Sequence, residues 1–321
     1  MGTLGGGDAT GSDGMFRLGL IGAGRMGRTH LQAIVGSQQV RVTGVVDSDP
    51  RTRAAVEAAG TPAFASLDEL LEAGQIDGAL IAVPTDRHVA VLENVAAAGI
   101  PVLCEKPCGL TVAETSQCAS AAGRAGVLLQ VAYWRRFVAE LRDIRQQVRS
   151  GELGEILAVN CYQWDAAPPS AEFRGSSGGI FIDMGVHEFD QVRWLTGQEF
   201  KTVHVASSAP GDSGRDPDCA QLVAELDGGT TAMVSLGRWH PAGDSCRVEV
   251  FGTKGTVSSW FLDPVDGDAV FRMALRRQAE AFAAAVRADD TVDFARRSAG
   301  SSADDALAAL SVACEATALS R

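Results

Sequence analysis

The segment that most restricts how this chain can fold is Gly22-Ala23-Gly24-Arg25-Met26-Gly27, which follows an apolar run at 16–21 and opens a helical pattern at 28–35. In a Gly-x-Gly-x-x-Gly pattern the glycines allow a tight turn, a close backbone approach to a pyrophosphate and close packing of helix on strand. The helix N-terminus also offers free N–H groups to phosphates. The pattern therefore predicts a dinucleotide site with contacts from Gly22, Gly24, Arg25, Met26 and Gly27.

A carboxylate follows at the spacing that such a site requires. The next strand, at 40–46, ends in Asp47, which lies twenty residues after Gly27. A carboxylate there accepts hydrogen bonds from the adenosine ribose hydroxyls and repels the 2′-phosphate of NADP. Asp47 thus favours NAD, although Ser48 and Arg51 follow closely and could receive a phosphate, which leaves NADP possible.

Strand and helix patterns then alternate along the first part of the chain. Strands are expected at 62–64, 78–83, 100–104 and 127–132, and helices at 52–60, 67–73, 88–99 and 112–125. Alternation of this kind indicates parallel βαβ units. We therefore expect an α/β Rossmann domain, which binds the dinucleotide, over residues 16–134.

Two turns at the carboxyl ends of these strands carry further candidates, because open α/β sheets bind ligands at that edge. Pro84, Thr85 and His88 follow one strand, and Glu105 and Lys106 follow the next. All five are predicted to contact the cofactor, with His88 as a packing residue at a helix start.

Lys106 precedes Pro107, on a backbone that proline restricts, and we expect its side chain to point into the cleft. There it could stabilise an alkoxide. The alternative is an ordinary surface lysine.

From Gly154 onward the pattern changes to successive strands without helices between them. The strands are expected at 156–164, 202–206, 220–226, 230–239, 246–251 and 255–259. Such a series predicts a mostly antiparallel open sheet. With the helices expected at 272–288 and 304–319, it indicates an α+β domain over residues 135–321, for substrate binding and oligomerisation.

Asp183 and His187 are the main catalytic candidates in this second domain. They lie four residues apart in a segment of helical character, so they are expected to share one helix face. A carboxylate can orient an imidazole that removes the proton of an alcohol. A surface salt bridge is the alternative. The preceding glycine-rich stretch, 175–179, is expected to form a flexible loop.

Composition excludes several other classes of function. A net charge of −12 without any Lys/Arg run argues against nucleic-acid binding, and no apolar run is long enough to span a membrane. Residues 1–15 are expected to form a disordered tail without signal-peptide character, and Met15 could be the true start. Seven scattered cysteines suggest reduced thiols in the cytoplasm, and no cluster has metal-ligand spacing.

The ordered set of motifs resembles one known family. Gly22-x-Gly24-x-x-Gly27, Glu105-Lys106-Pro107, the aromatic-arginine segment 133–137 and Asp183-x-x-x-His187 are similar to the glucose-fructose oxidoreductase / inositol dehydrogenase / MocA family over residues 16–321. The run 186–195 looks most like inositol 2-dehydrogenases. The resemblance implies a catalytic trio of Lys106, Asp183 and His187, and a cis bond before Pro107.

The resemblance further implies NAD-dependent oxidation of a secondary ring hydroxyl of a cyclitol, myo- or scyllo-inositol, by a homodimer or homotetramer. Tyr133, Trp134, Arg135, Gln163 and Trp164 are expected to line the substrate pocket with Asp183 and His187, although aromatic residues are as often core.

The segment 162–165 departs from the His-Arg-Asn-like sequence common in inositol dehydrogenases, and the region 260–271 is abbreviated. A pyranose or aminosugar dehydrogenase using NAD or NADP therefore stays open. So does a cofactor-binding regulator without catalysis.

Overall fold

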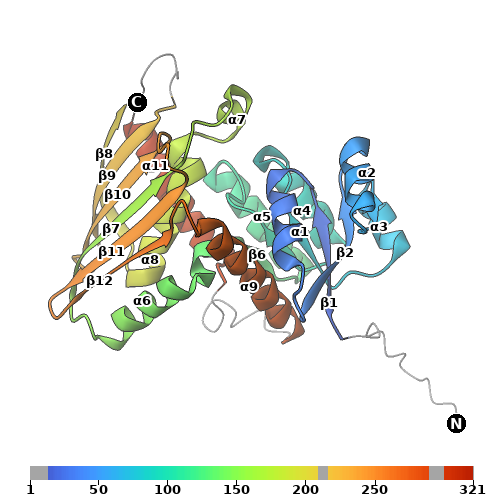
Figure 1. Ribbon diagram of the computed structural model, residues 1–321, viewed down its shortest axis with the longest axis horizontal. Coiled ribbons are helices and arrows are strands. Elements are labelled where there is room, and N and C mark those ends of the chain that lie inside the picture. Colours follow the sequence, from blue (N-terminus) through green and yellow to red (C-terminus); the bar gives the residue numbers. More distant parts are fainter. Residues whose placement is uncertain (1–13, 209–215, 289–299, 321) are drawn as a thin grey trace, which may run out of the picture.

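The computed structural model describes residues 14–208, 216–288 and 300–320. All but the last two residues of the expected tail, 1–15, lie outside that range. Two sheets with their helices form two layered halves of the molecule, the first on the right and the second on the left of Figure 1. No helix in the described ranges is long and apolar enough to cross a membrane.

The first sheet is parallel throughout, with the strand order β3-β2-β1-β4-β5-β6. Its strands are β1 (Phe16–Ile21), β2 (Val40–Val46), β3 (Ala63–Phe64), β4 (Gly78–Ile81), β5 (Val102–Cys104) and β6 (Leu129–Val131). The helices between them are α1 (Arg25–Ile34), α2 (Pro50–Ala58), α3 (Leu67–Ala73), α4 (His88–Ala97) and α5 (Val112–Ala125). This order is that of a Rossmann fold, so the predicted fold class of the first half is confirmed.

Local sequence explains these elements well. The central strands bury nearly every side chain, as parallel strands covered on both faces do; Leu18, Leu20 and Leu80 are fully buried. Ser66 caps α3 by accepting a hydrogen bond from the N–H of Glu69. Thr111 begins α5 with a capping box, and the helix ends where Gly126 adopts φ 67°.

The second sheet has the order β12-β11-β7-β10-β9-β8. Its strands are β7 (Ile156–Trp164), β8 (Phe200–Ser208), β9 (Cys219–Leu226), β10 (Thr231–Gly237), β11 (Ser245–Gly252) and β12 (Thr256–Leu262). Every neighbouring pair is antiparallel except β7 and β10, which are parallel. The mostly antiparallel sheet is therefore confirmed, with that one exception.

Helices cover the face of this sheet that looks toward the first domain (Figure 1). They are α6 (Ala139–Ser150), α8 (Val186–Thr196) and α11 (Ala303–Leu319). Of the stretch 175–179 that was predicted to be a flexible loop, residues 177–179 lie in no helix or strand, whereas 175–176 belong to a short helix, α7 (Ala171–Ser176). Arg174 ties it down by ion pairs with Asp216 and Asp218. Strand β12 continues to Leu262, beyond the end expected at residue 259.

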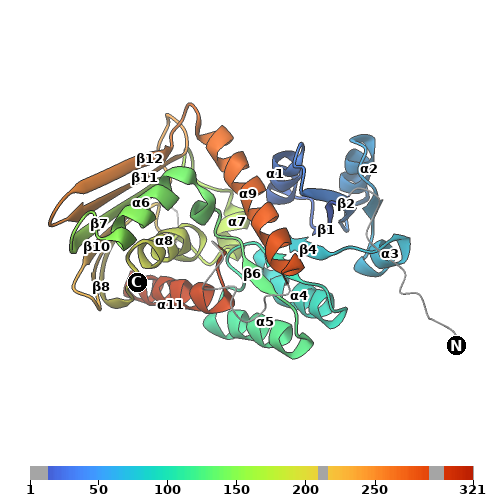
Figure 2. The same ribbon diagram turned by 90° about the horizontal axis from the view of Figure 1, so that it is seen from below.

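Helix α9 (Gly267–Arg287) returns to the first domain and runs along α1 (Figure 2). Phe282 packs edge-on against Phe16 of β1 with ring centroids 5.9 Å apart. The side chain of Arg276 donates to the carbonyl of Ala33 at 2.8 Å, and Ser37 donates to Glu280 at 2.7 Å. Helix α9 thus completes the core around the dinucleotide-binding half.

Candidate active site

The glycine pattern lies in the turn between β1 and α1, where two of its glycines are required by geometry. Gly22 has φ +93°, and a Cβ there would lie 2.7 Å from the carbonyl oxygen of Ala82. At Gly27 a Cβ would lie 2.0 Å from the oxygen of Gly22. Any side chain would therefore force the turn and α1 apart.

Gly24 differs, because a Cβ there would meet nothing within 4 Å. It is the N-cap of α1, and no side chain caps that end. The exposed backbone and the uncapped N–H groups leave a place where a pyrophosphate could sit. Arg25 is exposed beside it, and Met26 packs partly against the core.

Asp47 follows β2 at the same edge of the sheet. One carboxylate oxygen accepts from the N–H of Ala23 at 2.8 Å, and the other accepts from the N–H of Asp49 at 2.9 Å. Each oxygen keeps a lone pair for a ribose hydroxyl. These residues fit NAD by an observation independent of the motif, since the carboxylate is fixed against the glycine turn.

In the turn after β5, the side chain of Glu105 forms two hydrogen bonds. The Nε2 atom of buried His30 lies 2.6 Å from Oε1 of Glu105, and Oε2 of Glu105 accepts from the N–H of Lys106 at 3.1 Å. The Lys106–Pro107 bond is cis, as the resemblance implied. The Glu105 side chain therefore faces α1.

Lys106 reaches across to the second domain. Its ammonium donates to the main-chain carbonyl of Asp183 at 2.6 Å and lies 3.3 Å from the carboxylate Oδ1 of the same residue. The two residues are 77 positions apart in the chain. The structure thus brings Lys106 and Asp183 together, as expected of a catalytic trio.

Asp183 lies in a π-helical turn, Phe181–Gly185, that leads directly into α8. Such turns occur frequently at functional sites, because they change the direction of side chains along a helix. His187 follows in the first turn of α8. The carboxylate of Asp183 bonds to Lys106, while the Nδ1 atom of His187 is buried with no partner in the described part of the chain. The expected contact between Asp183 and His187 is therefore replaced by one between Asp183 and Lys106.

His187 is 7% exposed. Burial, followed by the positive charges of Lys106 and Arg135, lowers its pKa well below the usual value of a histidine. Tyr133 and Trp134 lie edge-on to the imidazole, with ring centroids 6.0 and 6.3 Å away. A neutral imidazole held in this way can accept a proton at neutral pH.

Arg135 is a buried residue whose contacts are with other side chains of the protein. It forms an ion pair with Glu188 at 2.6 Å, and both side chains are buried. Its guanidinium also donates to Oε1 of Gln163 at 2.7 Å and lies over the ring of Phe261. Gln163 is therefore positioned by Arg135, and the substrate contact of Arg135 stays a prediction.

Trp164 lies on the opposite side of the second sheet from Gln163, because successive side chains of a strand alternate. Its indole N–H donates to Ser235 at 3.0 Å, and Gln221 donates to the same hydroxyl at 3.0 Å. A Cβ on Gly237 would overlap the indole ring, so the ring covers that glycine. The structure thus separates Trp164 from the other predicted pocket residues.

Asp165 is the residue that sequence reasoning missed. It follows β7 and accepts from the side-chain amide of Gln163 at 3.3 Å. Burial, then the neighbouring Asp244 and, more weakly, Asp183, raise its pKa to about 6. The sequence signal was the segment 162–165, which differs from the sequence common in inositol dehydrogenases. Side chains alternate along a strand, so Gln163 and Asp165 are placed on one face.

The remaining cofactor candidates follow β4. Pro84 is exposed and Thr85 is half-buried, while His88 is buried at the start of α4. The two ring nitrogens of His88 lie 2.8 Å from the carbonyl of Pro107 and 2.9 Å from that of Val83. His88 thus packs beneath the turn, in agreement with its expected role at a helix start.

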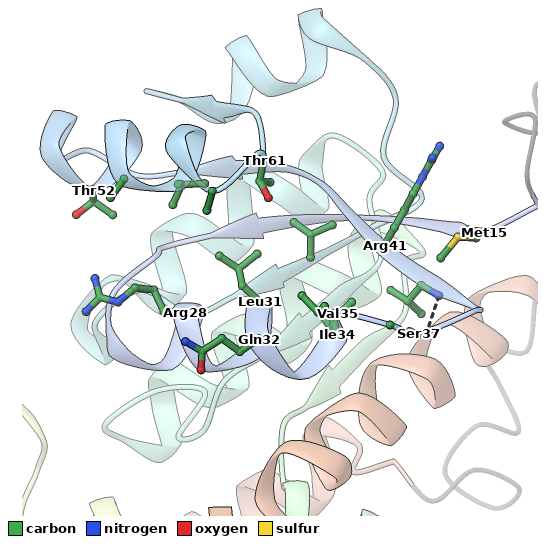
Figure 3. A pocket seen from close by; sticks show the side chains of 16 residues that line it. Met15, Arg28, Leu31, Gln32, Ile34, Val35, Ser37, Arg41, Thr52 and Thr61 are labelled. Atoms are coloured by element: carbon green, nitrogen blue, oxygen red, sulfur yellow. Dashed lines mark hydrogen bonds between the residues drawn. The ribbon is translucent and has the colours of Figure 1, made fainter. Parts of the chain in front are cut away.

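A separate pocket of about 490 Å³ lies between α1 and α2 over β2 (Figure 3). Apolar side chains form its floor, with Arg28 and Thr52 toward one end and Met15 and Arg41 toward the other. It contains none of the catalytic candidates. Among the described residues, no group of His, Cys, Asp and Glu side chains is arranged to hold a metal ion.

The fold and the site define the class of protein: a two-domain, NAD-binding oxidoreductase. Two family models match the chain, one described as an oxidoreductase family with an NAD-binding Rossmann fold over residues 16–133 and one as the GFO/IDH/MocA C-terminal domain over residues 141–258. The rhizopine catabolism protein MocA of Rhizobium meliloti is 47% identical over 307 residues, or 95% of each chain.

An inositol 2-dehydrogenase of the same species is 31% identical, over 92% of this chain and 94% of its own. The crystal structure of a myo-inositol dehydrogenase from Corynebacterium glutamicum has the same fold, with a TM-score of 0.84, 24% identity and coverage of 95% of this chain and 96% of that one. The chain belongs to the GFO/IDH/MocA oxidoreductase family. It is an NAD-dependent oxidoreductase that acts on CH–OH groups.

Proposed function

We propose that this protein oxidises a secondary ring hydroxyl of a cyclitol, myo- or scyllo-inositol, to the ketone with NAD. The observation that carries the proposal is the contact between Lys106 of the first domain and Asp183 of the second, beside a buried imidazole whose pKa is lowered. An ammonium and a neutral base beside one another suit the loss of a proton from an alcohol. Relatives named inositol 2-dehydrogenase support the choice of substrate.

In the proposed chemistry the residues of this chain handle the hydroxyl group. His187 accepts the hydroxyl proton, and the ammonium of Lys106 stabilises the negative charge that develops on the oxygen. Asp183 holds Lys106 in place, and the glycine turn and Asp47 hold the cofactor. NAD, when bound, supplies the acceptor for the hydride.

One observation favours a second candidate with the same chemistry. Asp165 and Asp244 place two carboxyl groups near Lys106 and Asp183, and the pKa of Asp165 is raised to about 6. An ammonium group on the substrate would favour the ionised form of Asp165. An aminosugar or an aminated cyclitol is therefore the alternative substrate class. A regulator without catalysis is disfavoured, because Lys106, Asp183 and His187 are all present.

The test is the initial rate of NADH or NADPH formation by the purified protein with myo-inositol, scyllo-inositol, D-glucose, D-xylose, D-glucosamine and an aminated inositol. Turnover of an inositol with NAD is the expected result. Turnover of a pyranose alone would retain the chemistry and reject the cyclitol. No turnover with any of these compounds, together with tight NAD binding, would favour the regulator. Assembly into a homodimer or homotetramer stays a prediction that light scattering would test.

A further inference from the structure

His30 occupies a position of α1 where an apolar side chain would be expected. The buried residues of this helix are Gly27, His30, Ala33 and Ile34, whose spacing is that of a helix face packed on a sheet. His30 is 0% exposed. An imidazole buried so completely costs free energy unless it is hydrogen-bonded, and its partner is Glu105, at 2.6 Å.

Glu105 connects this imidazole to the main chain of Lys106. Burial alone would raise the pKa of Glu105, but the hydrogen bond from His30 and the charges of His30 and Lys106 bring it below its usual value. The group is therefore a carboxylate. One oxygen bonds His30 and the other accepts from the N–H of Lys106 at 3.1 Å. The N–H of Glu105 itself donates to Ile81 of β4 at 2.9 Å.

The other side of Lys106 is held by a second buried histidine. His88 of α4 contacts the carbonyl of Pro107 at 2.8 Å, as described above. Helices α1 and α4 thus fix the residues immediately before and after Lys106. The side chain of Lys106 extends from this turn to Asp183.

We propose that His30, acting through Glu105, positions Lys106 relative to a dinucleotide bound at the N-terminus of the same helix. Stability alone does not require this pair, because replacing a buried ion pair by apolar residues of similar volume is often neutral or stabilising. What the pair provides is a fixed position of the Lys106 main chain relative to the glycine turn. The proposal rests on the proposed function for the task of Lys106, whereas the contact itself can be tested independently.

The test compares His30→Leu, which fills the space without a donor, with His30→Gln, whose amide nitrogen reaches about as far as Nε2. His30→Leu should lower kcat about tenfold to a hundredfold, because small displacements of a reacting group have effects of this size. The Kd for NAD and the KM for substrate should stay within about threefold, since the glycine turn and the pocket are unchanged. His30→Gln should recover most of kcat.

Gln278→Met is the matched control. Gln278 of α9 is also 0% exposed, and its side-chain amide has no partner within the described residues. It lies outside the cofactor and substrate positions, so this replacement should leave kcat unchanged. If His30→Leu, His30→Gln and Gln278→Met all behaved alike, the role of His30 would be packing and the proposal would be wrong.

A second measurement separates this proposal from the proposed function. Deuterium exchange at the amides of residues 104–106 in the NAD-loaded protein should be faster in His30→Leu and unchanged in His30→Gln. If the wild type turns over no polyol or sugar, the proposed function fails and the exchange result still decides on His30. If His30→Leu matches the active wild type in kcat and exchange, the positioning role is overturned.

Should His30→Leu fail to fold, Glu105→Gln tests the same contact from its other side. The amide nitrogen of the new side chain cannot accept a hydrogen bond, so either the N–H of Lys106 loses its partner or His30 can no longer donate to this side chain. Loss of kcat and faster exchange support the proposal, whereas wild-type values for both reject it. In the double variant with His30→Gln, effects smaller than the sum of the two single effects would show that both residues act through one contact.

Discussion

The cofactor end of the candidate site is formed mainly by backbone groups, whereas the substrate end is formed by side chains. At the cofactor end, backbone geometry carries the site: glycines at 22, 24 and 27, an uncapped helix N-terminus and one carboxylate. At the substrate end, charged and aromatic side chains from both domains meet around Lys106, Asp183 and His187. The first arrangement depends on local chain conformation, and the second depends on how the two domains are packed together.

This difference predicts which kinetic quantity each end controls. Substitutions at the substrate end should lower kcat with little effect on the affinity for NAD. Substitutions at the cofactor end should weaken NAD binding and leave kcat nearly unchanged at saturating cofactor. The variants below test this separation.

Lys106→Met should have the largest effect, a loss of about 10³-fold in kcat, because it removes the charged donor nearest to the developing negative charge. Methionine has nearly the same length, so NAD affinity should stay within a few-fold. Rates at saturating NAD and substrate would measure the effect. Lys201→Met is the control, since Lys201 of β8 is an exposed lysine that pairs with Glu225 of β9. A loss below about tenfold would mean that another group stabilises the oxygen.

His187→Ala should lower kcat about a hundredfold, as expected when a general base is removed. Its pH dependence sharpens the test. Since burial lowers the pKa of His187, the imidazole stays neutral and active to lower pH than an ordinary histidine. The rate of the wild type should therefore not decrease through about pH 6.5 but only under more acidic conditions. His204→Ala, at an exposed position of β8, is the control. A decrease centred near 6.5 would contradict the neutral, buried imidazole.

Asp47→Ser should raise the Kd for NAD about tenfold, through loss of a carboxylate that accepts hydrogen bonds from the ribose. It should also reduce the ratio of the Kd for NADP to the Kd for NAD, because the negative charge no longer repels a 2′-phosphate. Fluorescence titration with each dinucleotide would measure both effects. Asp49→Ser is the control, since Asp49 is the N-cap of α2 and serine caps helices as well. A lower kcat with unchanged Kd would remove Asp47 from the cofactor end.

Much of the first domain could be predicted because its signals are local in sequence. The glycine turn, the caps at Ser66 and Thr111 and the alternation of strands and helices all involve residues within a few positions of one another. Even His30 had a local signal, since a histidine three residues after Gly27 falls on the buried face of α1. That signal does not identify the partner, Glu105, which is 75 residues away.

The substrate end could be predicted only in its residue types. Lys106 and Asp183 were both expected in the site, but nothing in the sequence says that Asp183 pairs with the lysine instead of His187. That choice depends on a π-helical turn and on domain packing. Arg135 was expected at the substrate, and its buried partner Glu188 comes from another element. Because side chains alternate along a strand, Trp164 and Gln163 must point to opposite faces of β7. Which of the two faces looks toward the site is not given by the sequence.

Asp165→Asn should have the smallest effect on activity, and it tests how the substrate end recognises its ligand. Because the pKa of Asp165 is raised to about 6, the folded protein is penalised only when this carboxyl is ionised. The penalty is absent below about pH 4, grows as pH rises and is complete above about pH 6, so asparagine should stabilise the fold there by up to about 3 kcal/mol. For an amine-bearing substrate, the KM of the wild type should decrease by about threefold to tenfold as pH rises through 6, since an ionised carboxylate then meets the ammonium. Asp165→Asn should abolish this dependence, and Asp244→Asn should move it to lower pH by removing the second carboxylate. An unchanged KM profile in Asp165→Asn would assign the ionisation to another group and leave a neutral cyclitol as the better substrate.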